Sequence, residues 1–212
     1  MDVKSVLEHC GLSEAHFNAI AEAVPEGYAA LSKLMNDTPM FGQFIPGYRS
    51  LAHLRNVAVQ FALQTKAGAT ELFFTQDSWN AARNYSFLQL QVGQVVLTSH
   101  YCGAKGSRMV RAAVSRAELV QRTPDLFSSE DASPDIEALS KSAYAQIVHG
   151  GLNKPQLIAI RIPNRDQHSY SLRALSLEPI APTTAKVEEV ADRLHEQIRR
   201  RKTDKGGLAD VG

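Results

Sequence analysis

The sequence predicts an α+β fold: a mainly antiparallel sheet of about five or six strands with helices packed around it, an N-terminal helical segment and a C-terminal amphipathic helix. Two observations lead to this class. Apolar residues recur at helical spacing up to about residue 67, and from residue 71 they alternate with polar residues, as in strands. Short turns join the successive strand candidates, which favours antiparallel pairing.

The N-terminal helices are predicted from residues that start or stop a helix. A short helix over residues 3–10 ends at Gly11, and Ser13 is the N-cap of a second helix. The second helix is expected to stop at Pro25, because proline has no amide hydrogen to donate. Another short helix is expected over residues 26–35.

The clearest helix in the sequence covers residues 48–66, after a loop over residues 36–46. Its apolar residues recur at helical spacing, and a polar stripe that includes Arg49 and His53 occupies the opposite face. Gly68 is expected to close this helix.

Six segments are predicted to be strands. Alternation is clearest in residues 85–92, where Leu88 and Leu90 share one face and Gln89 points to the other. A helical turn is expected near residues 116–122. The strand candidates are residues 71–76, 85–92, 94–102, 108–114, 156–162 and 169–177.

A further helix is predicted between the fourth and fifth strand candidates, after a polar linker over residues 123–133. Ser133 and Pro134 open this helix and Gly150 with Gly151 ends it. The last helix has an apolar face and favourable Glu–Arg pairs four residues apart. We therefore expect a single domain over residues 1–202, with a helical part at 1–67, a sheet-rich part at 68–180 and the last helix at 184–202, followed by a flexible tail at 203–212.

Composition excludes some classes of protein. No apolar run approaches the roughly 20 residues of a membrane-spanning helix, and the first residues lack the pattern of a signal peptide. We therefore expect a cytoplasmic protein without a membrane partner. Cys10 and Cys102 are interpreted as free thiols, and two cysteines so far apart do not form a structural zinc site. No metal or cofactor is expected.

The charges are distributed unevenly along the chain. Residues 1–47 carry two basic and six acidic side chains, whereas residues 48–122 carry nine basic and three acidic ones. A basic region with interleaved aromatic residues can hold phosphates and stack bases. The candidate nucleic-acid-binding residues are Arg49, Arg83, Lys105, Arg108, Arg111, Arg199 and Arg200.

An enzyme is harder to argue from these residues. A divalent-metal nuclease would need carboxylates and a lysine on adjacent strands, but Gln89 and Gln91 stand where charged side chains are required. Metal-independent RNA cleavage would need an acid–base pair, for which His100 and His168 are the candidates, and the fold would have to bring them together. The phosphate-binding loop, serine-hydrolase and zinc-protease motifs are absent from the sequence.

Three hypotheses on function follow. The first is a nucleic-acid-associated protein that contacts phosphates through its basic central region, in a toxin–antitoxin or phage-defence system. The second is a non-catalytic interaction or regulatory module that binds an acidic or basic partner protein or forms a homodimer. The third is a metal-independent ribonuclease.

Overall fold

We describe the fold from a computed structural model of the chain. It describes residues 2–38, 45–80, 83, 85–105, 110, 112–122, 143–170 and 172–206, without the side chains of 45–49, 115, 122 and 197–206. Within these residues the helices are α1 (Val3–His9), α2 (Glu14–Asp37), α4 (Ile45–Thr70), α5 (Val114–Arg122) and α7 (Thr184–Gly206). The strands are β1 (Phe74–Trp79), β2 (Ser86–Val92), β3 (Val95–Tyr101), β4 (Ala143–Gly151), β5 (Pro155–Arg161) and β6 (Leu175–Ser176).

The described strands form one six-stranded sheet in the order β1-β2-β3-β4-β5-β6. Neighbours pair antiparallel except β3 and β4, which are parallel. Parallel neighbours need a long crossover, and α5 lies in the connection between β3 and β4. The structure confirms the predicted α+β class, the mainly antiparallel sheet and the helices at both ends of the chain; the domain boundaries stay a prediction.

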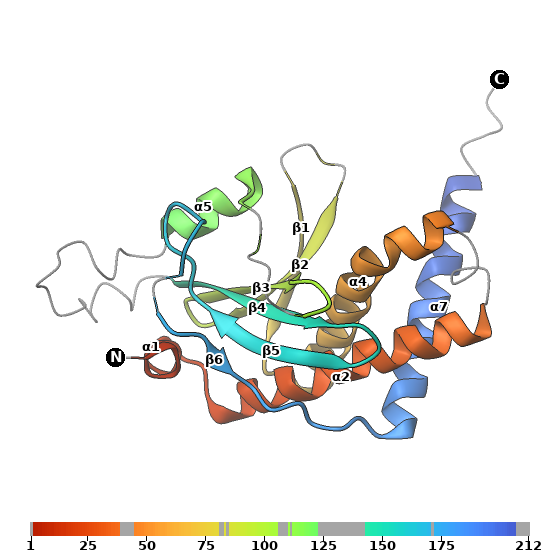
Figure 1. The fold of residues 1–212 in the computed structure, drawn as a ribbon, viewed down its shortest axis with the longest axis horizontal. Coiled ribbons are helices and arrows are strands. Elements are labelled where there is room, and N and C mark those ends of the chain that lie inside the picture. Colours follow the sequence, from red (N-terminus) through yellow and green to blue (C-terminus); the bar gives the residue numbers. More distant parts are fainter. Residues whose placement is uncertain are drawn as a thin grey trace, which may run out of the picture.

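Helices cover both faces of the sheet (Figure 1). Val95 and Leu97 of β3 share a face with Ala145 and Ile147 of β4, and this face packs against α1, α2 and α4 in the main core. The alternate side chains point the other way, where Tyr144 packs against Leu119 and Val120 of α5. Because side chains of a strand alternate between faces, each central strand contributes to two separate layers.

The helix predicted after Ser133 and Pro134 is wrong over the residues that the structure describes. Residues 143–151 form β4, and every residue of this strand is buried. A strand buried on both faces is apolar throughout, so its sequence does not alternate and resembles the stripe of a helix. Ser133 and Pro134 lie outside the described residues.

The predicted stop at Pro25 is also wrong, because α2 continues through it to Asp37. A proline inside a helix leaves the carbonyl four residues earlier without its usual donor. Here that carbonyl belongs to Ala21, and it accepts a hydrogen bond of 3.1 Å from the backbone amide of Ile180. A distant segment thus satisfies the group that the proline leaves unpaired.

The remaining helix and strand boundaries differ from the predicted ones by varying amounts. β1 begins at Phe74, three residues later than predicted, and β6 is only two residues long. Residues 108, 109 and 111 of the fourth strand candidate lie outside the described residues, and Val114 belongs to α5 rather than to a strand. The predictions for α1, the start of α2, α4, β2, β3, α5, β5 and α7 are confirmed, with end shifts of a few residues.

No helix in the described part of the chain is long and apolar enough to cross a membrane.

The contact between α2 and α4 depends on a glycine. A Cβ atom at Gly27 would lie 2.7 Å from Cα of Val59 and 2.8 Å from the carbonyl oxygen of Ala58, both backbone atoms of α4. Backbone atoms cannot move aside without shifting the helix, so the close approach requires a residue without a side chain.

We expect Gly27→Ala to lower the free energy of unfolding by about 1–3 kcal/mol, because the added methyl group forces α2 and α4 apart. Gly68→Ala in α4 is the matched control. An added Cβ there meets no atom within 4 Å, and alanine favours the helix by up to about 1 kcal/mol. Urea denaturation of both variants measures the difference. Equal effects of the two substitutions would contradict the close helix contact.

Candidate functional site

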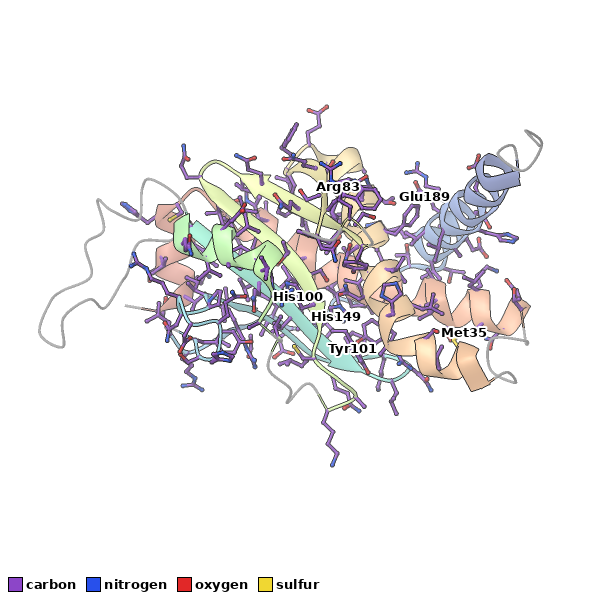
Figure 2. All side chains as sticks on the ribbon, turned by 90° about the horizontal axis from the view of Figure 1, so that it is seen from above. Met35, Arg83, His100, Tyr101, His149 and Glu189 are labelled. Carbon is purple, nitrogen blue, oxygen red and sulfur yellow. The ribbon has the colours of Figure 1, made fainter. Side chains whose placement is uncertain are left out.

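Two polar clusters lie on opposite faces of the central strands β3 and β4. Figure 2 shows His100, Tyr101 and His149 close together in the middle of the molecule. The parallel register pairs Tyr101 with His149 and His100 with Val148, so His100 points to the face opposite that of His149. We call Tyr28, Asn56, Ser99 and His149 the α4-side network, and Thr98, His100, Arg116, Tyr144, Gln146, Arg161 and Tyr170 the α5-side cluster.

The α4-side network joins two helices to two strands. The Tyr28 hydroxyl of α2 lies 3.1 Å from Nδ1 of His149, and Nε2 of His149 lies 3.2 Å from Oδ1 of Asn56 in α4. The hydroxyl of Ser99 in β3 donates to the same Asn56 oxygen over 3.4 Å. Because an amide oxygen only accepts, Nε2 of His149 carries the proton and Nδ1 accepts from Tyr28.

Side chains of α4 also fill a gap between β2 and β3. The pairing of these strands ends at Gln89 and Thr98. Beyond it, the backbone amide of Leu88 donates to Oε1 of Gln60 over 3.0 Å. The Tyr85 hydroxyl accepts from the side-chain amides of Gln60 and Asn56, each over 3.4 Å. Polar side chains of α4 thus replace the missing strand pairing.

A buried arginine closes the same end of the sheet. Nε of Arg55 donates to the Leu152 carbonyl over 2.8 Å, and its guanidinium carbon lies 5.6 Å from the centre of the Tyr101 ring. The Tyr101 hydroxyl donates to the Gly151 carbonyl over 3.0 Å. These contacts hold the turn between β4 and β5 against α4. Arg55 therefore has a structural role.

His149 is a neutral part of this network rather than a catalytic acid or base. Its side chain is 0% exposed, and burial lowers its pKa to about 3. Burial disfavours the charged imidazolium because water no longer solvates it. Both ring nitrogens already have partners, so the network is complete and holds the helices on the strands.

The α5-side cluster is built around the Tyr144 hydroxyl. Oγ1 of Thr98 lies 2.7 Å from this hydroxyl and 2.6 Å from Nε2 of His100. Nε2 of Gln146 donates to the Tyr144 hydroxyl over 3.5 Å, a long hydrogen bond. The strand register places Arg161 of β5 opposite Gln146.

Oε1 of Gln146 and the hydroxyl of Tyr170 are buried polar atoms of this cluster without a hydrogen-bond partner among the described residues. Gln146 is only 2% exposed. The guanidinium of Arg161 lies 4.9 Å from the centre of the Tyr170 ring and has no acidic partner among the described residues. The cluster therefore combines an unbalanced positive charge with unused hydrogen-bonding capacity.

The structure does not join the two histidines proposed for catalysis. His100 lies on β3 in the α5-side cluster, whereas His168 is exposed in the turn after β5, where its backbone amide donates to Oδ1 of Asp166 over 2.8 Å. Burial and the charge of Arg116 lower the pKa of His100 to about 3. A general acid or base works best with a pKa near the operating pH, so this value does not favour His100 in acid–base catalysis.

The candidate nucleic-acid-binding residues lie in several places. Arg83 is exposed in the hairpin between β1 and β2, apart from the central histidines (Figure 2), and Lys105 is exposed in a turn after β3. Neither has an acidic partner among the described residues. Arg49 lies in α4, and Arg199 and Arg200 lie in α7, but their side chains are outside the described set, as are Arg108 and Arg111 entirely.

The acidic N-terminal side chains are largely paired within the fold. Lys66 of α4 forms an ion pair with Glu22 of α2, and Lys186 of α7 lies 3.6 Å from the same carboxylate. Both lysines also lie 3.9 Å from Oε1 of Glu26, which is buried. These ion pairs fix α2, α4 and α7 to one another and balance the charges of Glu22 and Glu26 within the fold.

Neither cysteine is a reactive thiolate at neutral pH. Cys10 and Cys102 are free and buried, and burial raises the pKa of both, to about 11 for Cys102. No group of three or more histidine, cysteine, aspartate or glutamate side chains within the described residues is placed to hold a metal ion.

Most residues of the two clusters were not predicted from the sequence. His100 was a candidate site residue, whereas His149, Gln146 and Tyr170 were not. A usable signal was present: glutamine and histidine inside the apolar run of residues 143–151 have to find partners or a ligand, because unpaired buried polar groups are costly.

The comparisons with known proteins found no match: no protein-family model, no curated protein and no solved structure is similar to this chain.

We expect the protein to lose stability in mild acid. An unfolded histidine takes up a proton near pH 6.5, whereas His149 in the folded protein stays neutral down to about pH 3. Below pH 6.5 the unfolded state therefore binds more protons, and the free energy of unfolding falls by about 1.4 kcal/mol per pH unit from this residue. Urea titrations between pH 7 and pH 4 measure the slope.

His149→Gln should reduce that slope, since glutamine does not titrate. His195→Gln is the matched control, because His195 is exposed on α7 and is solvated in both states. A slope that stays unchanged in His149→Gln would show that His149 is not the buried neutral group.

We expect Asn56→Leu to lower the free energy of unfolding by about 2–4 kcal/mol, because it leaves the Nε2 hydrogen of His149 and the hydroxyl hydrogen of Ser99 without an acceptor. Gln64→Leu on the same helix is the control and should change stability by less than about 0.5 kcal/mol. Thermal unfolding compares the two. Similar small effects would mean that Asn56 does not link α4 to the strands.

Proposed function

We propose that this chain is a nucleic-acid-associated protein that contacts phosphates through its basic central region. The observation that carries the proposal is the difference in charge pairing. Glu22 and Glu26 are paired inside the fold, whereas Arg83 and Lys105 extend into solvent without acidic partners among the described residues. Unpaired cations attract a polyanion and release its counterions.

An exposed aromatic residue next to Arg83 supports a single-stranded ligand. Trp79 ends β1, four residues before Arg83, and its side chain is 61% exposed. A base can stack on an exposed indole, and such stacking does not depend strongly on sequence. Trp79 and Arg83 together provide one stacking surface and one phosphate contact on the β1–β2 hairpin.

A non-catalytic protein-interaction module is the second candidate, and the edge strand β1 favours it. β1 pairs only with β2 among the described strands, and Phe74 at its start is 67% exposed. An uncovered edge can receive a strand from a partner or from a second copy. The ribonuclease hypothesis has less support, because His100 and His168 are not joined and His100 stays neutral.

The proposed setting is the cytoplasm, and a toxin–antitoxin or phage-defence system is one context in which such a protein would act. The proposal for this context rests on the sequence-based hypothesis alone.

Fluorescence anisotropy of labelled single-stranded RNA and duplex DNA, titrated at several salt concentrations, tests the proposal. We expect affinity to fall steeply with salt, and Arg83→Asn to reduce the slope of log K against log salt by about one. Asparagine suits the positive φ of 52° at this position. Trp79→Leu should weaken single-strand binding by about 1–3 kcal/mol with the slope unchanged.

Arg173→Gln is the matched control, since Arg173 is exposed near β6 at the opposite edge of the sheet from β1. Trp79 is the only tryptophan, so quenching of its fluorescence reports stacking directly. Absence of binding at low salt would contradict the nucleic-acid proposal. Salt-insensitive self-association that is lost in a β1 variant would favour the interaction module instead.

A further inference from the structure

The α5-side cluster has features that its structural role does not explain. The α4-side network uses similar residue types, and both nitrogens of its histidine are paired. In the α5-side cluster, Oε1 of Gln146 and the Tyr170 hydroxyl are buried, and neither has a hydrogen-bond partner in the part of the chain that the structure describes. A buried polar atom left unpaired costs free energy, and native proteins contain few of them. Two in one cluster point to a missing binding partner.

The positive charge of the cluster determines the sign of the charge that its binding partner carries. Arg161 has no acidic partner within the described residues, and Arg116 lies close enough for its charge to act on His100. His100 is neutral and the remaining members, Thr98, Tyr144, Gln146 and Tyr170, carry no charge at neutral pH. The group that fits is therefore an anion, and the planar guanidinium of Arg161 suits an oxyanion.

The two unpaired atoms further restrict which anion can bind to the cluster. The Tyr170 hydroxyl can donate to an anionic oxygen, but Oε1 of Gln146 can only accept and needs a donor. A carboxylate or a sulfate at neutral pH has no hydrogen to offer. A phosphate ester loses its second proton with a pKa near 6, so at mildly acidic pH its terminal group presents one O–H group and a negative charge shared by two oxygens. Inorganic phosphate at that pH carries a second O–H group in place of the ester bond.

We propose that the α5-side cluster binds a monoanionic, protonated phosphate group, with its anionic oxygens on Arg161 and the Tyr170 hydroxyl and an O–H group donating to Oε1 of Gln146. Arg116, Arg161, His100 and Tyr170 are each partly exposed, whereas Gln146 is only 2% exposed, so the cluster runs from the surface into the interior. α5 packs over the neighbouring part of this face through Leu119 and Val120.

This inference does not rest on the nucleic-acid proposal. The α5-side cluster comes from β3, β4, β5, α5 and the segment after β5, whereas Trp79 and Arg83 belong to the hairpin at the β1 edge. Figure 2 shows Arg83 apart from His100. Inorganic phosphate and the terminal phosphate of a nucleotide share the chemistry described, and the binding assay separates these two sources.

The test is isothermal titration of the full chain at pH 6 with inorganic phosphate, with sulfate at equal ionic strength, and with cytidine 5′-monophosphate. We expect phosphate to bind and sulfate to bind at least about tenfold more weakly, because sulfate lacks the donor for Gln146. Tighter binding of the nucleotide would identify a phosphorylated end as the ligand, and equal or weaker binding would identify the free ion.

Three variants locate the binding to the cluster. Arg161→Gln should weaken phosphate binding by about tenfold or more, since it removes a charge-assisted contact. Gln146→Met should bring phosphate and sulfate to equal affinity. Tyr170→Phe should weaken the binding of both phosphate and sulfate. Lys154→Gln, in the exposed turn between β4 and β5, is the control that must leave phosphate binding unchanged.

The melting temperatures of the unliganded variants test whether the buried polar atoms lack partners in the free protein, which a binding assay does not show. Tyr170→Phe removes a buried hydroxyl without a partner among the described residues, so the unliganded variant should melt at the same temperature as the wild type or higher. Gln146→Met removes the long hydrogen bond from Nε2 to the Tyr144 hydroxyl as well as the unpaired Oε1, so its melting temperature reports both changes. A fall in the melting temperature of Tyr170→Phe would show that its hydroxyl already has a partner in the free protein and would overturn the proposal. So would phosphate and sulfate binding equally to the wild type, or phosphate failing to bind at millimolar concentration.

Discussion

Burial of β4 on both faces is the constraint on which the rest of this structure depends. Every residue from Ala143 to Gly151 is buried, and the strand lies between a parallel and an antiparallel neighbour. Two layers of helix are therefore required, with α1, α2 and α4 on one side and α5 on the other. Gln146 and His149 are enclosed by this arrangement, and each must find hydrogen-bond partners at its own face.

On the α4 side, one residue of α4 pairs with His149, and a second lies where β2 and β3 separate. Asn56 and Gln60 are one helical turn apart, so their amides project together toward the strands. One accepts from His149 and Ser99 and the other accepts from Leu88, at the point where β2 leaves β3. From this point the β1–β2 hairpin diverges from the central strands (Figure 1). Trp79 ends β1 and Arg83 follows in the turn of this hairpin.

The sequence was sufficient for elements whose pattern is local and failed where distant residues decide. Amphipathic helices such as α7 and alternating strands such as β2 carry their own signal. The continuation of α2 through Pro25 depends on the amide of Ile180, and the strand at 143–151 depends on partners on both sides. For the site, formal charge directed attention to exposed arginines, whereas the two clusters are made mostly of neutral side chains that only the strand register brings together.

The contrast between the two faces is itself an argument about function. Both clusters place a histidine with a pKa of about 3, a tyrosine and an amide side chain against the same pair of strands. If both were only structural, both would be expected to complete their hydrogen bonds, since each unpaired buried atom costs about 1–3 kcal/mol. Within the described residues, only the α4 side does so. On the α5 side the free protein bears the free-energy cost of these unpaired atoms. A ligand that supplies the missing donor and a negative charge removes this cost when it binds. The same unpaired atoms then provide selectivity, because a ligand without the donor leaves Gln146 unsatisfied and binds more weakly.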